Sequence, residues 1–404
     1  MYLSNLHTNI HRLRFYVAML VFFAVGVGYS SFYIPCVAIY LLIVLSGSLS
    51  SRLSRNILFL PSTLQIIQMF IPLSLALGYF VSLFLIGHER MTLASPFKIM
   101  ILISCLLILV TFIVSIEQNA SKENKFNLLT LLLSMGLGFF TKSSLVFFYS
   151  MFIDSKKYGY GCLLHPISKQ EVNSPEFSNL LIIPTILFLY NLISVKTNNA
   201  NGNKMTYLLP YSILIVLAIA EATILQGRIF FLLVGITFLL FMLKYYLRSS
   251  FSLILGVCGT AILFATPFAL EHLPSSLRPS ILTYKRIATG IHSSRFSLWS
   301  DGLQKLWAYP QGGFSVDQSI EPLSWFHNLW LDSARVAGFL PLFPLLLLNG
   351  FFIWRAIKKA RTSSQENAFI LFWLQLITLA LMFQDVIVEG NFPMFVCYFL
   401  IGIL

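Results

Sequence analysis

Four polar residues near the start of an apolar segment have types and spacing that suit proton chemistry: His327, Asn328, Asp332 and Arg335. If this stretch is helical, the last three share one face, because residues three, four and seven apart are neighbours. His327 then lies beside the mouth of this polar stripe. An imidazole can take up a proton near neutral pH, so His327 is the candidate base. The alternatives are structural: a lone histidine at a helix start, and an Asp332–Arg335 ion pair that holds helices together.

Arginines form a second group of candidates. Arg228 follows a tight turn between two apolar segments, and Arg286 and Arg295 lie in a long polar stretch. A planar guanidinium donates paired hydrogen bonds, so arginine suits phosphate and pyrophosphate better than lysine does. Three arginines that converge near a histidine would form an anion site beside a base, but the sequence does not show that they converge. Arg228 also suits an interfacial arginine whose stem lies along apolar residues.

Charged residues interrupt other apolar segments as well, and the positions concerned are Lys142, Glu221, Asp385 and Glu389. Such groups are costly in a membrane and face a cavity, an internal partner or the interface. The motifs DxD, Walker A, HExxH and GxSxG are not found. These motifs accompany metal-dependent, nucleotide-dependent or serine-based catalysis. We therefore expect neither a metal site nor a cofactor.

The elements that position these residues follow from the composition. Of the 404 residues, 57% are hydrophobic and 10% are charged, and the mean hydropathy is +0.81. Soluble proteins carry about 25% charged residues, so this composition indicates a membrane protein. The net charge of +12 would suggest nucleic acid in a soluble protein. In a membrane protein it reflects lysines and arginines on cytoplasmic loops, and no nucleic-acid partner is expected.

Apolar runs of about 20 residues are long enough to cross a bilayer. The sequence contains about twelve of them, at approximately 15–30, 32–47, 62–87, 97–116, 128–150, 179–195, 206–224, 229–247, 251–270, 328–353, 368–386 and 390–404. We predict an all-α integral membrane protein that forms a single polytopic domain over residues 1–404. Basic residues fall on alternate connections, which the positive-inside rule makes cytoplasmic. The opposite face then receives the turn before Arg228 and a large loop at 271–327.

The loop 271–327 is too long for a simple connection, and loops of this length usually carry function. From about 293 to 308, apolar residues alternate with Arg295, Asp301 and Lys305. This pattern favours an amphipathic helix that lies at the membrane surface.

Across 226–350 the motifs resemble those of the bacterial O-antigen polymerase and O-antigen ligase superfamily (Wzy and WaaL). The matching positions are Arg228 at the start of an apolar helix, Arg295-x-x-x-Trp299, Tyr309-Pro310-x-Gly312-Gly313, and His327-Asn328-x-x-Leu331 with Gly338. The polytopic layout with one large loop in the C-terminal third covers essentially the whole chain. The two glycines are adjacent here, whereas the commoner form is Pro-x-Gly-x-Gly, and no family position aligns with Arg286.

The resemblance implies a fold similar to the C-type glycosyltransferases and a metal-independent transfer from an undecaprenyl-pyrophosphate-linked glycan. His327 would match the histidine that activates the acceptor hydroxyl. Arg228 and Arg295 would match arginines that hold the pyrophosphate, and Arg286 is a further candidate. The remaining polar residues of the stripe would support the site. The resemblance also implies a bacterial inner-membrane location, a site that faces the periplasm, and a chain-length-regulating co-polymerase of the Wzz type as partner.

The run from Asn328 to Asp332 resembles polymerases more than ligases, so the expected reaction joins lipid-linked repeats into surface polysaccharide. Two alternatives stay open: a ligase that transfers glycan to the lipid A-core, and a transporter or flippase of lipid-linked glycans. A transporter more often shows two related halves with broken helices near the midplane. Here polarity gathers in one outside loop, which favours an enzyme.

Overall fold

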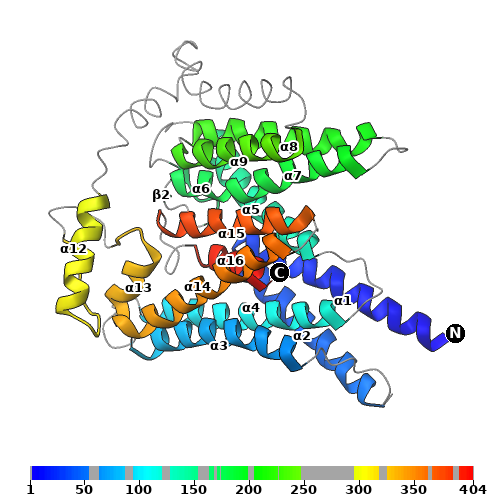
Figure 1. Cartoon of the computed structure of the whole chain (residues 1–404), viewed down its shortest axis with the longest axis horizontal. Helices are drawn as coiled ribbons and strands as arrows, with labels where there is room; N and C mark the ends of the chain where they lie inside the picture. Colours follow the sequence, from blue (N-terminus) through cyan, green and yellow to red (C-terminus); the bar gives the residue numbers. More distant parts are fainter. Residues whose placement is uncertain are drawn as a thin grey trace, which may run out of the picture. The chain divides into compact units, whose positions relative to one another are not determined.

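The computed structural model describes residues 2–53, 63–86, 94–120, 128–152, 163–167, 171–172, 174–198, 204–225, 227–246, 295–317, 325–362, 366–384 and 391–403. Within these ranges the chain is all-α, as predicted, apart from one two-stranded hairpin (Figure 1). Tertiary contacts group the residues into two compact units, Met1–Met135 with Ser294–Leu404, and Gly136–Ser293. The single polytopic domain over residues 1–404 stays a prediction.

Several predicted features lie outside the described residues. They are the span 251–270, Arg286, Asp385 and Glu389, together with most of the loop before Arg295.

The first unit combines N-terminal and C-terminal helices. Its elements are α1 (Tyr2–Val27), α2 (Ser30–Leu53), α3 (Thr63–Ile86), α4 (Ala94–Ala120), α12 (Arg295–Ala308), α13 (Leu329–Ala337), α14 (Phe339–Thr362), α15 (Glu366–Met382) and α16 (Phe392–Ile403). Apolar chains in lipid form helices because every backbone polar group is then satisfied internally. Helices α3 and α14 run side by side, and α16 packs against α4, α14 and α15 (Figure 1).

Helix α16 forms the centre of the first unit, and every one of its residues is buried. Tyr398 donates a hydrogen bond to the side-chain oxygen of Asn349 at 2.7 Å, which ties α16 to α14. Phe395 stacks on the ring of Tyr79, with 5.4 Å between the ring centroids. The Tyr79 hydroxyl is also hydrogen-bonded to the hydroxyl of Ser333 at 2.8 Å. The core of the unit therefore anchors α13 through α3.

The second unit contains most of α5 (Leu128–Phe152), the strands β1 (Leu163–Leu164) and β2 (Glu171–Val172), α6 (Ser174–Leu180), α7 (Ile182–Asn198), α8 (Lys204–Ile224) and α9 (Arg228–Tyr246). The strands pair antiparallel, and α7 packs against both α8 and α9 (Figure 1). Gly227 lies so close to α6 that a Cβ there would collide with the side chain of Ser178. This contact fixes the start of α9.

Among the described residues, 3 helical stretches are long and apolar enough to cross a membrane: Leu129–Ser150, Glu176–Ile193 and Phe339–Thr362. Seven further apolar helices are shorter. Large apolar side chains such as Leu340 and Phe343 on α14 are exposed. Helices of this kind suit a membrane protein, while the number and orientation of the spans stay predictions.

The prediction of one continuous helix over 328–353 is wrong. Helix α13 ends at Ala337, α14 begins at Phe339, and Gly338 between them has a φ of 67°. The Gly338 N–H donates to the carbonyl of Ala334 at 2.7 Å, which closes α13. A left-handed φ is accessible to glycine at no steric cost, so this residue ends one helix and redirects the chain into the next. A glycine inside an apolar run is a weak signal, which is why the pattern alone favoured continuity.

Candidate functional site

Asn328 determines where α13 begins. Its side-chain oxygen accepts hydrogen bonds from the backbone N–H groups of Trp330 and Leu331 at 3.1 and 3.2 Å. Its own backbone is extended, with φ −152° and ψ 115°. The first turn of a helix has N–H groups without helical partners, and asparagine is among the residues that satisfy them best. Asn328, predicted as a supporting residue, is therefore the N-cap of α13.

Asp332 holds the chain on both sides of His327. One carboxylate oxygen accepts from the N–H of Phe326 at 2.8 Å, and the other accepts from the N–H of Asn328 at 3.1 Å. The Nε atom of Arg335 lies 3.8 Å from the first oxygen, which confirms the ion pair expected from their spacing. Asp332 is 3% exposed, and a buried carboxylate requires such partners. Both carboxylate oxygens bind the loop backbone, so Asp332 positions this loop.

His327 lies between the two residues that Asp332 clamps. Its φ is 52°, a left-handed value that few residues other than glycine adopt. Such a conformation costs roughly 1–3 kcal/mol and persists where the surroundings hold it in place. Burial, and then the positive charge of Arg295, lower the pKa of the imidazole to about 4. His327 is therefore neutral near pH 7, with one of its two ring nitrogens unprotonated.

Arg295 is the first residue of α12 and reaches the same place. Its guanidinium donates a hydrogen bond to the side-chain oxygen of Gln384, two residues after the end of α15. Its positive charge lies close enough to His327 to lower the pKa of the imidazole. The structure thus brings a cation and a neutral imidazole to the start of α13.

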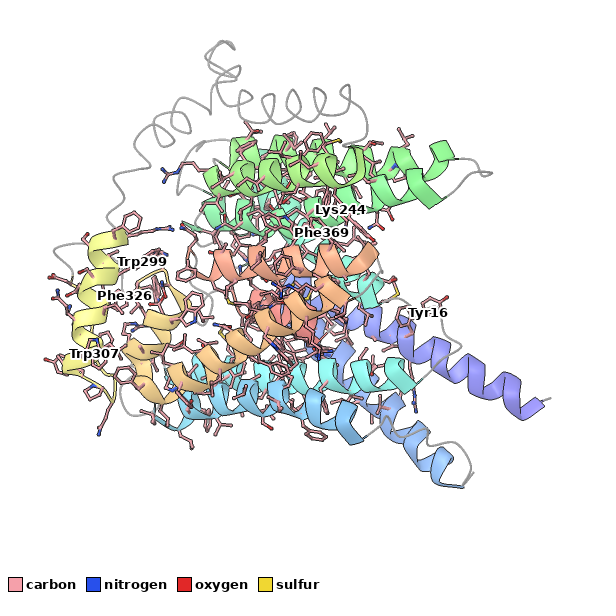
Figure 2. All side chains as sticks on the ribbon, in the orientation of Figure 1. Tyr16, Lys244, Trp299, Trp307, Phe326 and Phe369 are labelled. Atoms are coloured by element: carbon pink, nitrogen blue, oxygen red, sulfur yellow. The ribbon has the colours of Figure 1, made fainter. Side chains whose placement is uncertain are left out.

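Helix α12 is amphipathic, as predicted, and its buried face positions Arg295. Leu298, Gly302 and Leu306 are buried at a spacing of four residues, which places them on one helical face. A Cβ at Gly302 would lie 2.9 Å from a ring carbon of Phe326, so glycine permits this close packing. The indole N–H of Trp299 donates to the carbonyl of Phe326 at 3.1 Å. Figure 2 shows Trp299 and Phe326 together where α12 meets the chain leading into α13.

The turn after α12 packs its backbone against the junction of α13 and α14. The Gly313 N–H donates to the carbonyl of Arg335 at 2.7 Å, and the Phe339 N–H donates to the carbonyl of Pro310 at 3.0 Å. Gly312 has a φ of 78°, and a Cβ on it would lie 2.7 Å from the backbone nitrogen of Ala337. The adjacent glycines therefore allow a close approach of two backbones.

Most of the residues predicted for the site lie together in the first unit: Arg295, His327, Asn328, Asp332 and Arg335. Arg228 is the first residue of α9 in the second unit, as expected for an arginine that opens an apolar helix. That Arg228 and Arg295 bind the same pyrophosphate stays a prediction. Arg286 lies outside the described residues.

Sequence reasoning missed Gln384 and Phe383. Gln384 is the hydrogen-bond partner of Arg295, and the ring of Phe383 lies 4.2 Å from that of Trp330, between centroids. Both residues follow an apolar segment and belong to no recognisable motif. The only available signal was a polar residue at the end of that segment, which is too common to select a site.

A second group of polar side chains lies in the second unit. Glu221 is 2% exposed, and one of its oxygens accepts from the hydroxyl of Ser144 at 2.7 Å. Its other oxygen has no hydrogen-bond partner in the part of the chain that the structure describes. Lys142 lies 5.7 Å from the ring centroid of Phe177 and interacts electrostatically with Glu176. The predicted internal charges thus have local partners in this unit.

Within the described ranges, no group of three or more histidine, cysteine, aspartate or glutamate side chains is arranged to hold a metal ion. No known family model matches the sequence, and no curated protein matches it significantly.

Proposed function

We propose that this protein is an O-antigen polymerase, a metal-independent glycosyltransferase that joins undecaprenyl-pyrophosphate-linked oligosaccharide repeats. The observation that carries the proposal is the arrangement at the start of α13. Asp332 holds the backbone on both sides of His327, the imidazole of His327 is neutral near pH 7, and the charge of Arg295 acts on that imidazole. A base beside an arginine suits the transfer of a glycan from a pyrophosphate to a hydroxyl.

In the proposed reaction, the acceptor hydroxyl loses its proton to the imidazole of His327 while its oxygen bonds to the anomeric carbon of the donor. The bond between that carbon and the pyrophosphate oxygen breaks, and undecaprenyl pyrophosphate leaves with the electron pair. Arg295 donates hydrogen bonds to the phosphate oxygens and stabilises the negative charge that develops there. Arg228 is proposed to contribute a second guanidinium, and Arg286 a third.

The positive charge of Arg295 links the binding of the donor pyrophosphate to the basicity of His327. A pKa of about 4 makes the imidazole of His327 a weak base when the site contains no anion. A pyrophosphate on Arg295 would offset the positive charge that helps to lower this pKa. The proposed base therefore becomes stronger when the donor is bound, which favours proton transfer in the complete complex.

The remaining residues act through position. Asp332 holds the backbone on each side of His327, and Asn328 determines where α13 starts. Gln384 accepts a hydrogen bond from Arg295 and limits the orientations of its guanidinium. We assign these residues to the geometry of the base and the cation, with no contact to the reacting atoms.

The wider setting is part of the same proposal. The chain would cross the bacterial inner membrane about twelve times, with the site on the periplasmic face and polyprenyl chains among membrane lipids. A co-polymerase of the Wzz type would regulate product length. Polymerisation is preferred to ligation because the motif from Asn328 to Asp332 resembles polymerases more closely.

The test is the lipopolysaccharide of a deletion strain complemented with variants. Loss of a polymerase leaves a lipid A-core that carries a single repeat, because ligation of one unit still proceeds. His327→Ala should insert normally and give the same single-repeat band, whereas His165→Ala, a histidine of the hairpin in the second unit, should restore the full ladder. A bare core in the deletion strain would favour a ligase, and an unchanged ladder would exclude both activities.

A further inference from the structure

A row of four aromatic side chains begins beside Arg295 and continues to the start of α13. We call Phe296, Trp299, Phe383 and Trp330 the aromatic row. Successive ring centroids are 5.6, 6.1 and 4.2 Å apart, in that order. The rings come from α12, from the turn after α15 and from α13, so residues far apart in the sequence form a single surface.

The aromatic row occupies the same elements as the candidate site. Phe296 follows Arg295 directly, and Phe383 precedes Gln384, to which Arg295 donates its hydrogen bond. Trp299 is bonded through its indole N–H to the carbonyl of Phe326, the residue before His327. A molecule on the aromatic row would therefore lie next to both the proposed cation and the proposed base.

Two features of the aromatic row indicate a ligand that has an apolar face and also hydrogen-bond acceptors. Phe296 and Phe383 are 65% and 41% exposed, which leaves ring area for contact. The indole N–H of Trp330 is shielded from solvent and has no hydrogen-bond partner in the described part of the chain. An unsatisfied buried donor costs roughly 1–3 kcal/mol, so an acceptor from a ligand would be favourable there.

We propose that the aromatic row is a sugar subsite that holds a pyranose ring of the lipid-linked repeat next to the reacting bond. This inference rests on the proposed function. A pyranose presents one face of C–H groups and a rim of hydroxyls. Aromatic faces carry partial negative charge, and they attract C–H groups that approach them. A sugar hydroxyl oxygen can also accept a hydrogen bond from the indole N–H of Trp330. A lipid tail would need neither an aromatic face nor a donor, so the row fits a sugar better than a hydrocarbon chain.

Phe383 is the best position for a test, because it is exposed and holds no part of the His327 loop by a hydrogen bond. The probe is the oligosaccharide repeat released from the lipopolysaccharide of the same strain, without its lipid. Its binding to the purified full-length protein in detergent is followed by tryptophan fluorescence. Phe383→Tyr should bind as the wild type does, and Phe383→Leu should weaken binding by about fivefold, since leucine keeps apolar area but lacks the ring face.

Two further variants complete the experiment. Trp330→Phe removes the N–H and keeps a ring, and it should weaken binding severalfold. Phe343→Leu changes an exposed phenylalanine on α14 and serves as the matched control, with no change in affinity expected. In a turnover assay, Phe383→Leu should raise the KM for the acceptor repeat or for the donor and leave kcat nearly unchanged.

Equal affinity of the wild type, Phe383→Leu and Trp330→Phe would overturn the sugar subsite, as would the absence of any fluorescence change on titration of the wild type. The binding assay requires no turnover, so His327→Ala should still bind the oligosaccharide. A deletion strain with an unchanged ladder would instead overturn the proposed polymerase. The two failures are thus distinguishable.

Discussion

Two buried carboxylates, one in each unit, have very different surroundings. The oxygens of Asp332 accept from the backbone N–H groups of Phe326 and Asn328, and Arg335 lies close by. In Glu221, one oxygen accepts from Ser144 and the other has no hydrogen-bond partner in the part of the chain that the structure describes. Both oxygens of the first acid therefore have a donor, whereas only one oxygen of the second has a donor among the described residues.

This difference shows that burial alone does not identify the acid that matters to a site. Asp332 lies next to the proposed base, and each of its oxygens accepts a hydrogen bond from the loop backbone. Burial, and then the positive charge of Arg295, lower the pKa of His327. Asp332 therefore determines geometry, and the imidazole of His327 is the group proposed to accept a proton.

The largest expected effect comes from Asp332→Asn. The amide would keep one acceptor oxygen, but its NH₂ group would face a backbone N–H donor. We expect a loss of about 2–3 kcal/mol in local or global stability and a fall of at least about 100-fold in polymer formation. The measurements are the thermal midpoint in detergent and the lipopolysaccharide ladder.

Asp301→Asn is the matched control for that substitution. Asp301 lies on α12 and pairs with Lys305 at 2.7 Å, but it is partly exposed. Exposed ion pairs contribute little, so stability and product should stay close to wild type. Equal loss in the two variants would show that the backbone hydrogen bonds of Asp332 have no special role.

The second expected effect concerns the titration of His327. Its pKa of about 4 lies below the value near 6.5 of a free histidine. An unfolded chain would bind this proton at a higher pH, so the contribution of neutral His327 to stability is lost as pH falls from about 6.5 towards 4. In Arg295→Gln the pKa should rise while staying below 6.5, because burial is the larger cause.

Selective isotope labelling of histidine and titration by NMR would measure both values. The acid limb of kcat/KM for the wild type should follow the low pKa of the free enzyme. A pKa above 6.5 in the wild type would mean that a carboxylate pairs with His327, and the contrast between the two acids would be lost.

A smaller effect is expected from Asn328→Ala. This variant removes the helix cap and leaves the carboxylate of Asp332 with its backbone donors. Loss of an asparagine cap costs about 1 kcal/mol, and serine should restore most of it. The thermal midpoint should fall slightly and product formation severalfold. A loss as large as that of Asp332→Asn would indicate that Asn328 contacts the substrate.

The smallest effect is expected from Glu221→Gln. Glutamine keeps an oxygen for Ser144 and removes a charge from a site where one oxygen has no partner in the described structure. Polymer formation should be unchanged, and the thermal midpoint should be equal or higher. A clear loss of product would mean that the unpaired oxygen takes part in function, which would reverse the roles of the two acids.

Features that depend on neighbouring residues were predictable from the sequence. Long apolar runs predicted most helices, the alternation around Arg295 predicted α12, and the spacing of Asp332 and Arg335 predicted their ion pair. Features that depend on distant segments were not predictable. The partner of Arg295 follows α15, and the break at Gly338 depends on a turn almost thirty residues earlier. The donors that bind Asp332 were also not predictable. They depend on the loop conformation, and backbone N–H groups carry no sequence signal.

The contact between the turn at Pro310 and the junction at Gly338 joins backbone to backbone. Such hydrogen bonds tolerate changes in side chains but not changes in spacing, since one inserted residue would move every donor away from its acceptor. Point substitutions outside the glycines should therefore accumulate readily here, whereas insertions and deletions should be selected against. A chimera that borrows this region from another protein of the same fold should exchange Arg295 to Phe339 as one block, with both crossovers outside it.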